Sequence, residues 1–186
     1  MKIIAITPPH AVENEVVIIR QLFEKGVDIV HLRKHQSDIE GEDVNAYLRE
    51  ILSALTFAER SRIIIHDYPQ LYYEYSLKGI HINKNITSFP EDYTGFKTRS
   101  CHSLVEIQKY KSEYDYLFLS PVFDSISKSE YKSSITDAML QKASLEGLID
   151  EKVIALGGVT FDKIPYLQSL NFGGVAMIGG IYDLLK

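Results

Sequence analysis

Short apolar runs alternate regularly with helix-like patterns along this chain, and that alternation constrains the fold more than any other feature. The runs lie at residues 3–6, 27–32, 63–65, 79–82, 98–102, 116–119, 153–156 and 175–178. Most are continuously apolar and rich in β-branched residues, which is typical of strands buried on both faces of a parallel sheet. Between them apolar residues recur at helical spacing, as in Val16, Ile19, Leu22 and Phe23 before Gly26, a predicted C-terminal glycine.

Eight such units predict a closed (β/α)8 TIM barrel, because open doubly wound sheets more often have five or six strands. The chain has 186 residues, which is short for a fold whose lower limit is about 200. Beyond the Gly179-Gly180 pair that ends the eighth unit only residues 181–186 remain, so the final helix is expected to be short or missing. No linker or low-complexity segment interrupts the pattern, and residues 1–186 are therefore expected to form a single domain.

Two later helices carry start signals. Ser103 is expected to cap a helix together with Glu106, three residues on, as a capping box. Thr136 is expected to cap the helix that carries Leu140, and a further helix is expected after Asp162.

Composition narrows the functional classes. Hydrophobic residues make up 45% of the chain and charged residues 24%, which is ordinary for a globular protein. The net charge of −5 argues against non-specific binding to nucleic acid or to an anionic membrane surface. No apolar run approaches the roughly 20 residues of a membrane helix. Cys101 is the single cysteine, which excludes an intrachain disulfide and favours a cytoplasmic location.

In TIM barrels the active site lies at the carboxyl ends of the strands, and polar residues follow most of the predicted strands here. Five of the six histidines are expected at this rim. An alternative is that His and Asp merely serve as turn and cap residues there. The segments concerned are His31-Leu32-Arg33-Lys34-His35, His66-Asp67, His81 with Asn83-Lys84-Asn85, and Ser100-Cys101-His102-Ser103.

Two glycine pairs follow the last two predicted strands, Gly157-Gly158 and Gly179-Gly180. Loops at these places often form a phosphate cup, because glycine lets backbone N–H groups approach an anion. The alternative is that glycine only permits tight turns. Arg33, Lys34 and Lys128 form a second candidate anion site, with Lys34 expected to face outward from the barrel.

Asp67 is an acidic residue among basic neighbours. Its carboxylate could hold Mg²⁺, with waters and substrate phosphates completing the coordination shell, or it could be a turn residue before Pro69. Ser100, Ser125 and Ser127 offer hydroxyl groups, without a base in a triad pattern.

Taken in chain order, these motifs resemble the family of thiamin-phosphate synthase and its relative thiazole tautomerase. The resemblance covers nearly the whole chain. His31-Leu32-Arg33 resembles the family's Gln-Leu-Arg stretch, His66-Asp67 its Asn-Asp pair, and Ser100-Cys101-His102-Ser103 its Ser-x-His-Ser/Thr stretch. Ser120-Pro121-Val122-Phe123 with Ser125-Ile126-Ser127-Lys128 resembles its Gly-Pro-Val/Ile-Phe/Tyr then Thr-x-Thr-Lys segment. The family's last two strand motifs are matched by Ala155-Leu156-Gly157-Gly158-Val159 and Gly174-Val175-Ala176-Met177-Ile178.

The resemblance implies a transferase of thiamin biosynthesis. A pyrimidine methyl diphosphate would lose diphosphate with the help of Mg²⁺, and the nitrogen of a thiazole phosphate would capture the resulting cation. The implied partners are thus small phosphate substrates, and a homo-oligomer is also implied. The implied catalytic residues are Arg33, His35, Ser100 and Lys128, with Asp67 holding the metal. The implied substrate-binding residues are His31, His66, Ser125, Ser127, Gly158, Gly179 and Gly180.

The chain departs from the synthase pattern at three places. His35 stands where the family has Lys, and His66 where it has Asn. The family's second metal carboxylate has no counterpart at residues 83–86. A thiazole tautomerase needs no metal and would use histidine acid–base chemistry, but the family's tautomerase histidine is replaced by Pro121. The pattern also allows a non-catalytic binder of thiazole or thiamin phosphate, and the glycine cup alone would suit a sugar-phosphate isomerase.

Overall fold

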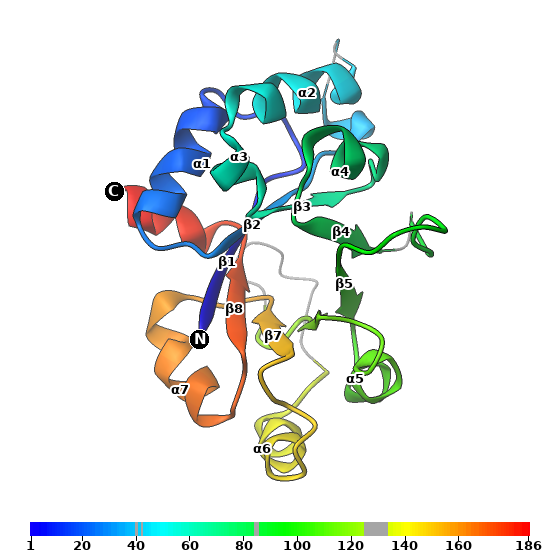
Figure 1. Ribbon diagram of the computed structural model, residues 1–186. Helices are drawn as coiled ribbons and strands as arrows, with labels where there is room; N and C mark the ends of the chain where they lie inside the picture. Colours follow the sequence, from blue (N-terminus) through cyan, green and yellow to red (C-terminus); the bar gives the residue numbers. More distant parts are fainter. Residues whose placement is uncertain (40, 42, 84–85, 125–133) are drawn as a thin grey trace.

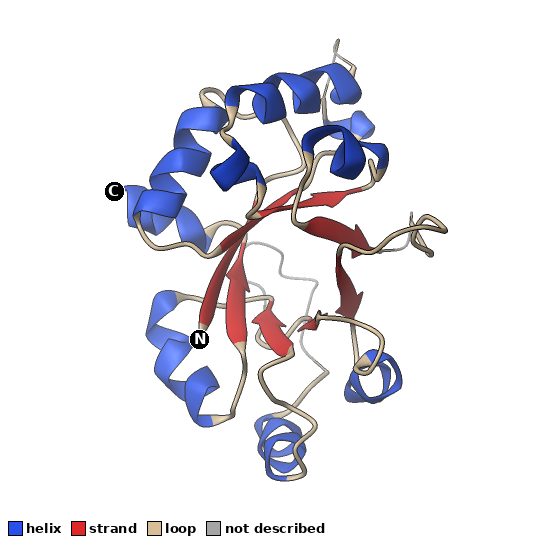
Figure 2. Cartoon of the chain, in the orientation of Figure 1, coloured by secondary structure: helices blue, strands red, loops and turns tan. Residues whose placement is uncertain are grey.

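The computed structural model describes residues 1–39, 41, 43–83, 86–124 and 134–186. Within them eight parallel strands close a barrel, each pairing with its neighbours in sequence and β8 returning to β1 (Figure 2). The strands are β1 (Lys2–Ile6), β2 (Ile29–Leu32), β3 (Ile63–His66), β4 (Gly79–Ile82), β5 (Phe96–Cys101), β6 (Tyr116–Leu119), β7 (Val153–Leu156) and β8 (Gly174–Met177). The predicted TIM barrel is confirmed.

Helices surround the strands on the outside of the barrel (Figure 1). The final helix is short, as predicted: it is a single 3₁₀ segment, η3, that lies beside α1. The α-helices are α1 (Glu15–Glu24), α2 (Val44–Ala54), α3 (Phe57–Arg60), α4 (Gln70–Tyr75), α5 (Leu104–Tyr110), α6 (Asp137–Leu145) and α7 (Ile164–Ser169). The 3₁₀ segments are η1 (Gln36–Asp38), η2 (Phe161–Lys163) and η3 (Gly180–Leu185).

The connection between β4 and β5 departs from strict alternation, because its described residues, 83 and 86–95, form no helix. Aromatic side chains pack there instead. The Tyr93 hydroxyl accepts a hydrogen bond from Ile80 N at 2.8 Å and donates one to Phe96 O at 2.6 Å. The Phe89 ring stacks on Tyr93 at 4.9 Å between centroids. Tyr93 thus ties the two strands together directly.

The expected helix ends are mostly present. Gly26 has a φ of 91°, and the chain turns out of α1 there. Ser103 accepts from Glu106 N at 3.2 Å, and Thr136 accepts from Met139 N at 3.3 Å. The capping box at Ser103 is incomplete, because the Glu106 carboxylate accepts from His102 N instead, at 2.6 Å.

The barrel has two apolar regions. A large core lies between the strands and the helices, and a smaller one fills the barrel interior. The interior core consists of Ile4, Ile6, Ile29, Ile64, Tyr116, Phe118, Ile154 and Ala176. Successive strand residues face opposite sides of the sheet, so the residue two positions after an inward-facing one also faces inward. His31 follows Ile29 in this way, and His66 follows Ile64. Among the described residues no helix is both long and apolar enough to cross a membrane.

Candidate active site

A layer of histidines lies inside the barrel, on three consecutive strands. His31 of β2, His66 of β3 and His81 of β4 are 0%, 5% and 1% exposed. The ring centroids of His66 and His81 are stacked 4.2 Å apart, and those of His31 and His66 lie 5.1 Å apart, edge to face. The sequence pattern predicted all three at the rim. His66 and His81 do border the cavity at the rim, whereas His31 lies fully buried beneath it.

His31 connects two neighbours through both of its ring nitrogens. Its Nδ1 lies 2.8 Å from His66 Nε2, and its Nε2 contacts the Tyr116 hydroxyl from the far wall of the barrel. Burial lowers the pKa of His31 and of His66 well below the ordinary value, and repulsion from His81 lowers both further. Both imidazoles are therefore neutral near pH 7.

His81 holds Ser100 in a defined orientation. The Thr98 hydroxyl lies 3.5 Å from Ile80 O, to which it donates, so its oxygen accepts from His81 Nδ1 at 2.8 Å. The other ring nitrogen, Nε2, then accepts from the Ser100 hydroxyl at 2.9 Å. Burial lowers the pKa of His81 to about 3, with smaller contributions from Arg33 and Arg99.

The rim above the histidines is charged. Arg33 Nε donates to His35 Nε2 at 3.1 Å, and His35 Nδ1 faces Asp67 Oδ2 at 3.2 Å. Asn83 Nδ2 donates to Asp67 Oδ1 at 2.9 Å. Asp67 has a φ of 60°, a left-handed conformation uncommon for a residue other than glycine. This backbone turn brings its carboxylate to His35 and Asn83.

A cavity of about 540 Å³ opens at this rim, between the carboxyl ends of the strands. Of the predicted residues, Arg33, His35, His66 and Ser100 line it. Asp67 stands behind His35 and Asn83, and His31 lies fully buried beneath. The predicted residues Ser125, Ser127 and Lys128 lie outside the described residues.

Lys34 faces outward, as predicted, but it does not belong to the anion site. Its side chain is fully buried, and its Nζ lies 2.8 Å from the Glu15 carboxylate of α1. It also donates to the backbone oxygens of Pro8 and His10 at 2.9 and 2.7 Å. This ammonium group anchors the loop after β1 to α1.

A second cavity of about 400 Å³ lies between the ends of β7 and β8, where the sequence predicted a phosphate cup. Gly158, Gly179 and Gly180 all line it. It adjoins the first cavity, because Leu156 and Ile178 line both.

The glycines of this cup differ in how much room a side chain would have. Gly158 has a φ of 62°, and a Cβ there would lie 2.4 Å from Asp124 O, so any side chain would strain the loop. A Cβ on Gly179 would meet nothing within 4 Å, and one on Gly180 would lie 3.5 Å from Val159 O. Gly158 is thus required by the fold, whereas Gly179 leaves open space.

Sequence reasoning missed the partners of the histidines. Tyr116 and Thr98 lie within strands and carried no motif. Arg99 and Glu106 also line the rim cavity, and neither was singled out for the site. Lys163 Nζ donates to Gly158 O at 2.5 Å, next to the cup. The signal that could have found them is strand alternation. Every second residue before Ser100 and Ser120 faces the same side of the sheet, which leads back to Thr98 and Tyr116.

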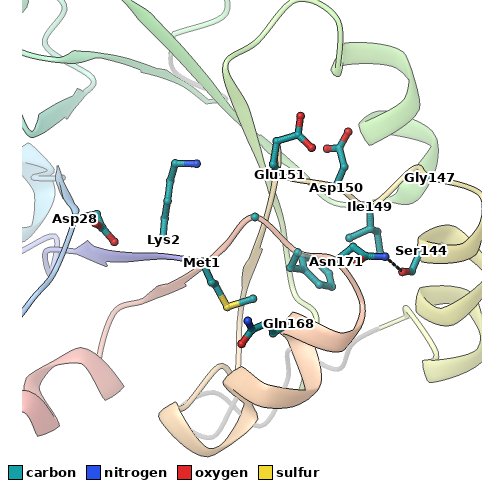
Figure 3. A pocket seen from close by; sticks show the side chains of 12 residues that line it. Met1, Lys2, Asp28, Ser144, Gly147, Ile149, Asp150, Glu151, Gln168 and Asn171 are labelled. Carbon is teal, nitrogen blue, oxygen red and sulfur yellow. Dashed lines mark hydrogen bonds between the residues drawn. The ribbon is translucent and has the colours of Figure 1, made fainter.

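A further hollow, of about 850 Å³, lies at the opposite end of the barrel (Figure 3). Its polar groups serve the surrounding loops. Asp28 accepts from Ile3 N at 2.7 Å, Asp150 pairs with Lys111 at 2.6 Å, and Asn171 donates to Ser144 at 3.0 Å. In TIM barrels this amino-terminal end contributes to stability, so the candidate site is the pair of cavities at the carboxyl ends.

Comparison with known proteins gives a consistent result. The model of the family described as thiamine monophosphate synthase matches residues 3–181. A crystal structure of thiamine phosphate pyrophosphorylase from Bacteroides thetaiotaomicron is 36% identical, covers 98% of this chain and 85% of that one, and superposes with a TM-score of 0.84. The thiamine-phosphate synthase of Salmonella paratyphi B is 25% identical over 181 residues, 92% of this chain and 82% of its own length.

A structure of thiamine phosphate pyrophosphorylase from Pyrococcus furiosus shares the fold, with 19% identity, 98% of this chain and 91% of that chain covered, and a TM-score of 0.72. The family model covers almost all of the barrel, including both cavities at its carboxyl end. The chain therefore belongs to the thiamine monophosphate synthase family.

Proposed function

We propose that this chain is a thiamin-phosphate synthase, a transferase that joins a pyrimidine methyl diphosphate to a thiazole phosphate and releases diphosphate. The observation that carries the proposal is the pair of adjoining cavities. One has cationic and hydroxyl groups at its rim, the other has a glycine cup, and Leu156 and Ile178 separate them. A transfer between two phosphorylated substrates needs two such compartments side by side.

The rim cavity suits the diphosphate. In the proposed step the bond between the pyrimidine methylene and the diphosphate oxygen breaks, and the oxygen keeps the electron pair. The thiazole nitrogen then donates its lone pair to the methylene carbon. Negative charge grows on the leaving oxygens, and the Arg33 guanidinium and Ser100 hydroxyl are placed to stabilise it. Lys128, outside the described residues, is proposed for the same role.

The second cavity suits the thiazole phosphate. Backbone groups of Gly179 and Gly180 at the start of η3 would hold the phosphate, and Leu156 and Ile178 offer an apolar wall to the ring. Ser125 and Ser127 are proposed to face the thiazole. Asp183 also lines this cavity, and its carboxylate pairs with Lys186 at 2.6 Å, which reduces its repulsion of a phosphate.

The residues present fit an Mg²⁺ ion held by a single carboxylate. Asp67 supplies a hard oxygen ligand just behind the rim cavity, and Asn83, which binds it, occupies the segment where the second family carboxylate is expected. Mg²⁺ is often bound through one or two carboxylates, with waters and substrate phosphates completing its shell. When bound, the ion would neutralise charge on the departing diphosphate. Asp67 would have to exchange its His35 contact for the ion.

The test is the formation of thiamin phosphate, measured as thiochrome fluorescence after mixing the protein with both substrates and Mg²⁺. We expect product that depends on Mg²⁺ and is lost in Asp67→Ala. Arg49→Ala removes an exposed arginine paired with Glu74 and is the matched control, with unchanged turnover. No product from folded protein, beside a working synthase, would contradict the proposal.

One observation favours a second candidate, thiazole tautomerase. Three neutral imidazoles lie beneath the cavity, and two of them line it. A neutral imidazole has a lone pair that can accept a proton, but burial makes these three weak bases by lowering the pKa of each. The contacts from Tyr116 through His31 to His66 would link the cavity to the barrel interior. A tautomerase would act on the thiazole carboxylate phosphate alone, without Mg²⁺. Turnover of that single substrate, lost in His66→Asn, would replace the synthase proposal.

A further inference from the structure

We propose that His31, His66 and His81 form a binding site for one divalent transition-metal ion of the zinc type, inside the barrel beneath the rim cavity. This site is separate from the Mg²⁺ position proposed at Asp67. It rests on the three histidines alone and does not depend on the proposed transferase activity.

The backbone brings the three rings to one level. His66 and His81 are direct partners in the register of β3 and β4, and His31 pairs with Ile64, two residues before His66 on β3. All three side chains point into the barrel, where Tyr116 and Phe118 form the opposite wall. A site built on strands has its backbone positions fixed more precisely than one built on loops, so only the side chains would need to move.

The distances bracket those of a metal site. One nitrogen from each ring can be chosen so that all three lie within 4.8 Å of one another. Zinc–nitrogen bonds of about 2.0–2.1 Å in tetrahedral geometry place two ligand nitrogens about 3.4 Å apart. The present His31 Nδ1 to His66 Nε2 distance of 2.8 Å is shorter than this value, and the 4.8 Å limit is longer. Ligation would therefore require the rings to rotate, above all those of His66 and His81, which are now stacked with their in-plane lone pairs side by side.

The chemical state of the rings is correct for ligation. A histidine binds metal through an unprotonated nitrogen, and all three rings are buried, an environment that favours the neutral imidazole. Thr98 holds the Nδ1 proton of His81, which leaves Nε2 as the lone pair. Tyr116 contacts His31 Nε2 and would accept a hydrogen bond from it once Nδ1 binds the ion. Such outer partners are a regular feature of histidine metal sites.

The ligand set also selects the metal. Three imidazoles suit Zn²⁺ and Co²⁺, whereas Mg²⁺ requires oxygen ligands. Three protein ligands leave a fourth position, and His66 and His81 border the rim cavity, so water or a substrate oxygen could reach it. Ser100, which now binds His81 Nε2, would exchange that bond for the ion.

The test uses the full chain after dialysis against a chelator, titrated with Zn²⁺ by calorimetry and with Co²⁺ by visible absorption. We expect one ion per chain and the intense Co²⁺ bands of a four-coordinate nitrogen site. Weak bands like those of hydrated Co²⁺, or no saturable binding, would overturn the proposal whatever the variants do.

Three variants locate the ion. His66→Asn should weaken Zn²⁺ affinity by about 100-fold or more, beyond the 10–100-fold typical of an outer-shell partner, and His31→Gln should behave alike. His10→Ala removes an exposed histidine and should leave the affinity unchanged. As a further control, Asp67→Asn should also leave it unchanged. Circular dichroism checks that each variant is folded. Unchanged affinity in both folded histidine variants, or loss in Asp67→Asn alone, would place the ion elsewhere.

Discussion

The barrel interior and its rim use the same strands for opposite electrostatic purposes. His31 of β2 is neutral and fully buried, whereas Arg33, two residues further along the chain and just after the strand, lines the open cavity. On β4 the buried His81 is followed by Asn83, which binds the Asp67 carboxylate. A step of two strand residues spans only about 7 Å. Burial separates the two layers: the lower one is neutral and hydrogen-bonded, and the upper one carries charge.

This difference assigns a different function to each layer. Charged groups at the rim can attract and stabilise a phosphorylated substrate without a large desolvation cost, because they remain partly hydrated. The neutral layer can offer lone pairs and proton routes but no net charge. Changes at the rim should therefore affect turnover, and changes in the interior should affect stability and its pH dependence.

The largest expected effect is on turnover, at the rim. Arg33→Ala should lower kcat/KM for thiamin phosphate formation by about 100- to 1000-fold, or ~3–4 kcal/mol, because a preorganised donor to the leaving group is lost. Urea unfolding should remain close to that of the unmodified chain. A tenfold or smaller loss of turnover would remove Arg33 from the reaction and weaken the contrast between the layers.

A change in the interior should act on stability first. His31→Leu removes the partner of both His66 and Tyr116 and leaves two buried polar groups without it. The free energy of unfolding should fall by about 2–4 kcal/mol, since each unsatisfied buried group costs about 1–3 kcal/mol. His10→Ala, at an exposed histidine, should change it by less than about 0.5 kcal/mol. Equal stability of both variants in urea would show that the layer contributes nothing.

The pH dependence of the free energy of unfolding reports on the interior histidines. The folded-state pKa of each interior histidine is lowered, to about 3 for His81, so below pH 6.5 the unfolded chain binds protons that the folded chain does not. Stability should be unaffected by these groups above about pH 7 and fall as the pH drops towards 5. Each histidine adds a slope approaching ~1.4 kcal/mol per pH unit. His81→Gln removes one of these groups, so the slope should fall by up to ~1.4 kcal/mol per pH unit. An unchanged slope would contradict a neutral interior.

The smallest effect is expected at the glycine cup. Gly179→Val places a side chain where a Cβ meets no neighbour, so the fold should tolerate it. We expect the KM for thiazole phosphate to rise about tenfold, or ~1.4 kcal/mol, with little change in the KM for the pyrimidine diphosphate. A change confined to the diphosphate KM would reverse the assignment of the two cavities.

Sequence patterns predicted the barrel because continuous apolar runs and their spacing are local properties. The same patterns predicted that Arg33, His35 and Ser100 meet, since strand ends of a parallel barrel converge on one face. They failed on the depth of one histidine. His66 and His81 border the rim cavity, but His31 is fully buried beneath it, because a strand's last inward residue cannot be separated from its first loop residue without the register.

Partners across the barrel were equally hidden. Tyr116 reaches His31 from the opposite wall, a contact between residues 85 apart in sequence. Lys34 was predicted to face outward, but its burial against Glu15 depends on where α1 lies, which no local signal fixes. Regular alternation predicted a helix between β4 and β5, whereas in the described part of that connection Phe89 and Tyr93 stack and Tyr93 ties the strands directly.

The central claim is that two adjoining cavities hold two phosphorylated ligands at the same time. Calorimetric titration of thiazole phosphate into protein saturated with diphosphate and Mg²⁺ tests this most directly. The prediction is one thiazole phosphate per chain, bound as tightly as in the absence of diphosphate, while diphosphate binding itself is lost in Arg33→Ala. Displacement of one ligand by the other would show a single shared site and contradict the two-compartment transferase.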